Sequence, residues 1–184
     1  MISPDIYPFE GKTLDLNGSR MHYLDEGAGD PVVMVHGNPT WSIYYRNLVL
    51  ALRGTHRCIV PDHIGCGLSD QPDDAPYDYT LPRVDDLEAL LDSLDIRDNI
   101  TLGVHDWGGM IGMAYATRHP ERIARLVVLN TSAFHLPDTK MFPWPLWLVR
   151  TPLGAVLVRG INAFAAVAAR VCGTSTQMPR KMRP

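Results

Sequence analysis

An aspartate at a strand-to-helix turn is the feature of this sequence that most directly indicates a type of chemical reaction. Residues 104–109 read Val-His-Asp-Trp-Gly-Gly, with an apolar run before them and a helix-forming run after them. The pattern predicts a nucleophile elbow, a sharp turn that presents its central side chain, with Asp106 where serine is usual. A helix N-terminus favours an ionised carboxylate, which can attack an electrophilic carbon without a base and form an ester. Asp106 could instead be an ordinary helix N-cap, since aspartate caps helices well.

A second loop is expected to face this turn. Residues 36–39 read His-Gly-Asn-Pro and directly follow the short apolar run 31–35. In the α/β-hydrolase fold, this loop gives one backbone N–H to an oxyanion hole, and the residue after the nucleophile gives the other. The donors here would be the amides of Asn38 and Trp107. Two motifs in the right order, each at a strand end, predict this fold.

The elements that must position these residues alternate along the chain. Apolar runs of strand length alternate with stretches of helical periodicity, which predicts a mostly parallel, doubly wound α/β sheet with right-handed crossovers. We expect a hairpin at 12–25, strands at 31–35, 57–60, 99–105 and 122–129, and helices at 42–53, 81–94 and 107–119. The hydrolase core should occupy residues 1–134, the start of a helical cap residues 135–172, and an irregular tail residues 173–184.

Composition excludes several classes of protein. The chain has 184 residues, 46% of them apolar, which suits one α/β domain. Its net charge of −3 is not the basic charge that nucleic-acid-binding proteins carry. No signal peptide is recognisable at the N-terminus, and no uninterrupted run reaches the roughly 18 apolar residues of a membrane span. The three cysteines lack metal-ligand spacing. We therefore expect a cytoplasmic protein without a metal or other cofactor.

Three segments resemble the haloalkane dehalogenase-like branch of the α/β-hydrolase superfamily. They are residues 36–42, 61–70 and 105–109. The resemblance implies that Asp106 attacks the halogen-bearing carbon, while the indole of Trp107 and the side chain of Asn38 hold the departing halide. Neutral donors in a dry pocket are suited to this role, because they stabilise developing negative charge.

Residues 7–9, 84–92 and 142–147 further resemble the β-lactone decarboxylases of bacterial long-chain olefin synthesis. This resemblance implies a small apolar substrate, a cis-β-lactone with two alkyl chains, which Asp106 opens and which loses carbon dioxide to leave an alkene. It also implies partner enzymes of the same pathway.

Other hydrolase classes fit the residues less well. Epoxide hydrolases share the aspartate and tryptophan but need tyrosines in the cap, and all seven tyrosines here lie at or before Tyr115. Haloacetate dehalogenases carry arginine where this chain has Trp107. A serine esterase is excluded, because the elbow has no serine.

The general base and the acid that complete such a site are not found in the sequence. No histidine follows His135, no acidic residue follows Asp138, and residues 130–133 contain no carboxylate. We expect His36 and His63 to be structural, and His22 to have no motif nearby. The chain is therefore expected to be a fragment of a longer enzyme. It would be either a half-site that alkylates Asp106 and stops, or a non-catalytic remnant that binds apolar ligands or a partner.

Overall fold

The computed structural model describes residues 3–72, 81–133, 151–161, 163, 166 and 167. The chain divides into two compact units, Met1–Phe134 and His135–Pro184. The second unit contains helix α5 (Pro152–Ile161). His135, Asp138, segment 142–147 and the tail 173–184, on which several of the sequence expectations depend, lie outside the described residues.

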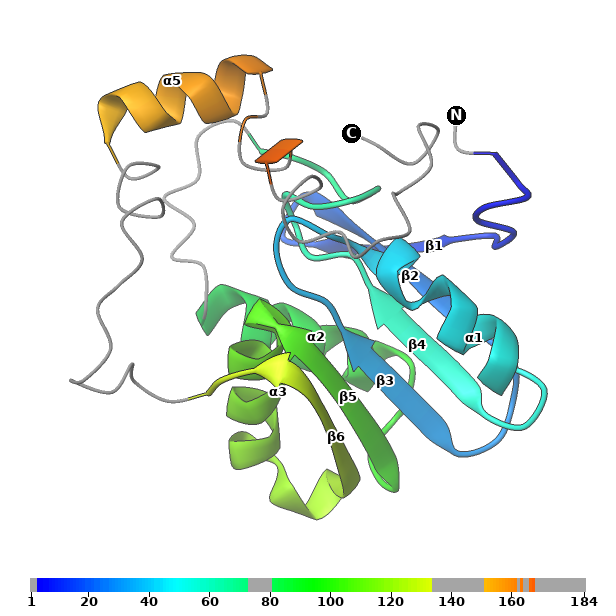
Figure 1. Ribbon diagram of the computed structural model, residues 1–184. Helices are drawn as coiled ribbons and strands as arrows, with labels where there is room; N and C mark the ends of the chain where they lie inside the picture. Colours follow the sequence, from blue (N-terminus) through cyan, green and yellow to red (C-terminus); the bar gives the residue numbers. More distant parts are fainter. Residues whose placement is uncertain (1–2, 73–80, 134–150, 162, 164–165, 168–184) are drawn as a thin grey trace. The chain divides into compact units, whose positions relative to one another are not determined.

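The first unit is built on a six-stranded sheet with the order β1-β2-β4-β3-β5-β6 (Figure 1). The first two strands form the predicted hairpin about Asn17 and Gly18, both of which have positive φ. β2 pairs antiparallel with β4. The pairs β4–β3, β3–β5 and β5–β6 are parallel. The predicted strands are confirmed to within two residues: β1 (Lys12–Leu16), β2 (Ser19–Glu26), β3 (Pro31–Val35), β4 (Arg57–Pro61), β5 (Ile100–Asp106) and β6 (Ile123–Thr131).

Helices cover both faces of this sheet. The helix expected at 42–53 is a 3-10 turn, η1 (Ser42–Tyr45), that continues into α1 (Arg46–Leu52). The other helices of the unit are α2 (Leu81–Ser93), α3 (Trp107–Arg118) and the short η2 (Pro120–Arg122). One buried cluster joins α2 and α3 to the sheet, and a second joins α1 to the opposite face. Parallel strands covered on both faces read as continuous apolar runs, which is why β3 and β4 could be found from sequence.

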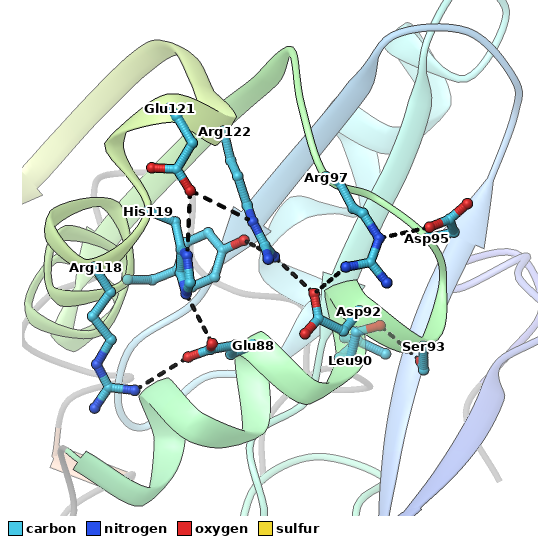
Figure 2. A network of polar contacts seen from close by, with 11 residues as sticks. Glu88, Leu90, Asp92, Ser93, Asp95, Arg97, Arg118, His119, Glu121 and Arg122 are labelled. Carbon is cyan, nitrogen blue, oxygen red and sulfur yellow. Dashed lines mark hydrogen bonds and ion pairs between the residues drawn. The ribbon is translucent and has the colours of Figure 1, made fainter.

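Figure 2 shows polar contacts that join α2 to the end of α3 and to η2. Nε2 of His119 lies 2.8 Å from Oε1 of Glu88, and Nη1 of Arg122 donates to Oδ1 of Asp92 at 2.7 Å. Both contacts are partly buried, since the side chains of His119 and Arg122 are 19% and 13% exposed. They therefore add polar contacts to the buried apolar cluster that packs α2 against α3.

Strand β6 is the edge of the described sheet and is the least covered strand of its parallel part. It pairs with β5 along its whole length, yet Leu126, Val127, Val128 and Leu129 are 38–53% exposed. Among the described strands, β6 therefore presents an apolar edge.

Candidate active site

The elbow lies where β5 ends and α3 begins. Asp106 is the last residue of β5 and has φ 52° and ψ −128°, a backbone conformation that residues with a side chain rarely adopt. Its carboxylate makes no capping hydrogen bond with α3. The interpretation of Asp106 as an ordinary N-cap is therefore wrong for its side chain, although the residue occupies the N-cap position.

The carboxylate is instead held by the loop after β3. The backbone N–H of Asn38 donates to Oδ1 of Asp106 at 2.9 Å, and this is the contact between the two motifs that the sequence predicted. A Cβ on Gly37 would lie 2.1 Å from the same oxygen and 2.6 Å from the backbone nitrogen of Trp107. Only glycine leaves room for this approach, so Gly37 sets the distance between the loop and the elbow.

The far side of the turn is packed as closely. A Cβ on Gly108 would lie 2.1 Å from the carbonyl oxygen of Val35, which brings the start of α3 against the end of β3. The hydroxyl of Thr131 donates to the backbone carbonyl of Asp106 from the end of β6. This role of Thr131 could not be predicted from the sequence, because the contact depends on a register shift between β5 and β6 that no local pattern reveals.

Asp62 is a second residue that sequence reasoning did not single out. It is fully buried and accepts hydrogen bonds from the backbone N–H of Ser42 at 2.6 Å and of Leu68 at 3.0 Å. Nδ1 of His22 lies 2.9 Å from its Oδ2. The expectation that His22 has no motif nearby is therefore wrong, because the residue contacts the 61–70 segment. Asp62 ties that segment to β2 and to η1.

His36 and His63 form a buried pair beneath the 36–39 loop. Nε2 of His36 accepts from the backbone N–H of His63 at 3.2 Å, which leaves Nδ1 to donate to the carbonyl of Gly37 at 2.8 Å. Nε2 of His63 in turn donates to the carbonyl of His36 at 3.2 Å. Burial lowers the pKa of both imidazoles. Both are therefore neutral donors and acceptors that fix the loop, as the sequence predicted.

The remaining described histidines are also engaged away from the nucleophile. The ring of His105 stacks on Tyr44 with centroids 4.4 Å apart and an interplanar angle of 19°. His119 contacts Glu88, and His56 contacts Thr55. Among residues 3–72 and 81–133, no histidine hydrogen-bonds to the Asp106 carboxylate. A general base in this part of the chain is thus not identified.

Of the two predicted leaving-group donors, Trp107 follows Asp106 in the chain, and Asn38 lies in the loop after β3 that contacts the elbow. Trp107 begins α3 and is 41% exposed, whereas Asn38 is half-buried. Burial, and after it the nearby negative charge of Asp106, raises the pKa of Tyr44. The roles of Asp106, Trp107 and Asn38 stay predictions, since geometry alone assigns no chemistry to them.

A separate apolar groove of about 370 Å³ lies between α1 and β6, on the sheet face that α1 partly covers. Met34, Tyr45, Leu48 and Leu129 are among its lining residues, and none of the three candidate site residues contributes to it. Within the described ranges, no group of three or more His, Cys, Asp or Glu side chains is placed to hold a metal ion. In the same part of the chain, no helix is long and apolar enough to cross a bilayer.

Comparison with known proteins agrees with this geometry. The chain is 68% identical over 168 residues to a cis-3-alkyl-4-alkyloxetan-2-one decarboxylase of Shewanella oneidensis, covering 90% of this chain and 53% of that protein. It is 42% identical over 137 residues to haloalkane dehalogenase 2 of Mycobacterium tuberculosis, covering 74% of this chain and 46% of that protein. A crystal structure of a haloalkane dehalogenase from Agrobacterium tumefaciens superposes with a TM-score of 0.73 at 28% identity, covering 85% and 54% of the two chains.

These matches confirm the resemblance that the sequence motifs indicated. The chain spans about half the length of each of these relatives. A family model described as the alpha/beta hydrolase fold matches residues 30–182. Motif, sheet order and family model thus agree, and the chain belongs to the alpha/beta hydrolase fold family.

Proposed function

We propose that this chain supplies the nucleophile of an α/β-hydrolase that forms a covalent ester between Asp106 and a small apolar substrate. The observation that carries the proposal is the hydrogen bond from the Asn38 amide to Oδ1 of Asp106 at the apex of the elbow. This bond orients the carboxylate, and no hydrogen bond from the described residues reaches Oδ2. We assign Oδ2 as the attacking oxygen and assign the indole of Trp107 and the side-chain amide of Asn38 as donors to the leaving group.

We further propose a cis-β-lactone as the substrate, supported by the 68% identity to the Shewanella decarboxylase. Oδ2 attacks the ring carbon C4, the C4–O bond breaks, and the ring opens to an ester that carries a free carboxylate on C3. Loss of carbon dioxide then leaves its electron pair to form the C3=C4 double bond. The bond from C4 to Asp106 breaks in the same step and returns the carboxylate. Because a β-lactone is reactive, partner enzymes of the same pathway would supply it.

A haloalkane is the second candidate substrate, favoured by the identity to the mycobacterial dehalogenase. Here Oδ2 displaces a halide ion and forms an alkyl ester at Asp106. This ester has no electron pair to expel the aspartate, so its release needs an activated water. Since no described histidine contacts the carboxylate, we expect the alkyl ester to persist in this chain.

Intact-mass measurement after incubation with a long-chain alkyl iodide tests the nucleophile. We expect the gain of one alkyl group per chain, released halide in equal amount, and loss of both in Asp106→Asn. Asp85→Asn, on the exposed side of α2, is the matched control and should react as the parent does. A folded parent chain that gains no mass, or a modification that persists in Asp106→Asn, would contradict the proposal.

Incubation with a cis-3,4-dialkyl β-lactone then separates the two substrates. Lactone chemistry predicts alkene and carbon dioxide in equal amounts and a protein that returns to its original mass. Adduct formation with the iodide, together with an inert lactone, would favour the dehalogenase alternative.

A further inference from the structure

The side chain of Asn38 has a partner that the proposed chemistry does not use. The thiol of Cys66 donates to Oδ1 of Asn38, with a distance of 3.6 Å between sulfur and oxygen. Asn38 lies in the loop after β3 and Cys66 in the loop after β4, and both residues are half-buried. Because β3 and β4 are neighbouring parallel strands, their carboxyl ends bring the two loops together.

The backbone around Cys66 fixes the position of the thiol. The N–H of Cys66 donates to the carbonyl of His63 at 2.8 Å, and the N–H of Ser69 donates to the carbonyl of Cys66 at 3.1 Å. Asp62 holds the same loop through the N–H of Leu68. The thiol is therefore carried by a turn that hydrogen bonds hold both before and after Cys66.

The thiol is also kept in its protonated form. Burial raises the pKa of Cys66, and this outweighs the adjacent guanidinium of Arg83, which favours the thiolate. A protonated sulfur has one hydrogen to donate, and the amide oxygen is an acceptor for it. A flipped amide would instead bring a second donor to a sulfur that already faces the Arg83 guanidinium, and would leave the thiol hydrogen without this acceptor.

We propose that Cys66 is a positioning residue that selects one orientation of the Asn38 amide. With the oxygen bound by the thiol, the NH₂ group is presented on the opposite side of the amide and serves as the leaving-group donor. This inference rests on the proposed function, because it takes Asn38 as a donor to the leaving group. It adds a residue from the 61–70 segment to the determinants of the site.

Infrared spectroscopy of the S–H stretching region tests the contact without any activity. The band of Cys66 is identified by its absence in Cys66→Ala. We expect this band to shift in Asn38→Ala, because the thiol loses its acceptor, while the band of Cys58 stays in place. Cys58 is fully buried on β4 and serves as the internal control. A Cys66 band that does not move would overturn the inference, whatever the chain's reactivity.

The rate of ester formation at Asp106 tests the consequence. In Cys66→Ala we expect the rate with an alkyl chloride to fall about three- to tenfold, as for the loss of one neutral hydrogen bond. The fall with the corresponding iodide should be smaller, because iodide leaves with less assistance. Cys66→Ser keeps a donor and should restore most of the rate. Cys58→Ala should keep the parent's ratio of chloride to iodide rates.

These outcomes separate the inference from the proposed function. Equal chloride-to-iodide ratios in the parent, Cys66→Ala and Cys66→Ser would show that the thiol only fills space. A parent chain that forms no ester with either halide would remove the proposed function. The infrared shift would then still decide whether the thiol orients the amide. Circular dichroism of each variant establishes that the compared chains are folded.

Discussion

Strands β3 and β6 have similar apolar sequences but opposite surroundings. Val33 and Val35 of β3 are completely buried, whereas Val127 and Val128 of β6 are 44% and 53% exposed. β3 pairs with a strand on each side, while β6 pairs only with β5 among the described strands. An apolar run thus predicts that a strand forms, but its place in the sheet decides how completely the strand is covered.

The same contrast applies to how closely each region is packed. The end of β3 meets the elbow at distances that exclude a single added carbon atom, as at Gly37 and Gly108. β6 contributes one close contact, from Thr131 to the elbow, and otherwise carries exposed side chains. We therefore expect substitutions at the elbow to change the free energy of unfolding strongly, and substitutions along β6 to change it little.

The largest effect is expected for Gly108→Ala. Its Cβ would lie 2.1 Å from the carbonyl oxygen of Val35, and backbone cannot move aside as a flexible side chain can. Overpacking of this kind should lower the free energy of unfolding by about 3 kcal/mol and abolish ester formation at Asp106. Urea denaturation measures the change. Gly54→Ala, which meets no atom within 4 Å, is the control. Equal stability of the two variants would contradict the packing argument.

A pH titration of stability tests the histidine pair beneath the loop. His36 and His63 have lowered pKa values in the folded chain, so the unfolded chain binds protons first as the pH falls. Their contribution is therefore present above about pH 6.5, the ordinary histidine value, and is lost below it. Each histidine can remove up to about 1.4 kcal/mol per pH unit.

The measurement is the free energy of unfolding between pH 7.5 and pH 5. His63→Gln keeps a donor for the carbonyl of His36 but does not titrate, so we expect a shallower pH dependence. An unchanged slope in that variant would assign the pH dependence to other groups.

The same substitution on the two strands compares them directly. Val33→Thr buries a hydroxyl and should lower the free energy of unfolding by about 2 kcal/mol. Val128→Thr places the hydroxyl on a half-exposed edge and should change stability by no more than about 0.5 kcal/mol. Light scattering should also show slower aggregation of Val128→Thr, since apolar edge strands promote self-association. If the free energy of unfolding falls equally in both variants, the difference in burial between β3 and β6 does not affect stability.

Local patterns were sufficient to find the strands, the elbow and the loop that faces it. The 31–35 run and the turn after β5 predicted that Asn38 and Asp106 would meet, and their contact at 2.9 Å agrees. Helix 42–53 was predicted as uniform, yet its first turn is 3-10, where Ile43, Tyr44 and Tyr45 have low helix propensity. The sequence therefore predicts elements better than it predicts their exact geometry.

Contacts between distant segments were not predictable in this way. Thr131 reaches the elbow through a register shift, Asp62 reaches His22 across 40 residues, and Cys66 reaches Asn38 from another loop. Each contact depends on strand pairing, which periodicity within one segment does not determine. These supporting residues were therefore missed, while the roles of Asp106, Trp107 and Asn38 stay predictions.

The backbone conformation of Asp106 has a consequence for how this chain can evolve. Its φ of 52° and ψ of −128° suit glycine, and a side chain there costs about 1–3 kcal/mol. Glycine at position 106 would relieve this cost, but it would also remove the carboxylate that accepts the hydrogen bond from Asn38. In any lineage released from selection for the reaction, mutation should carry this position toward glycine. A retained aspartate would mark descendants in which the carboxylate is still used.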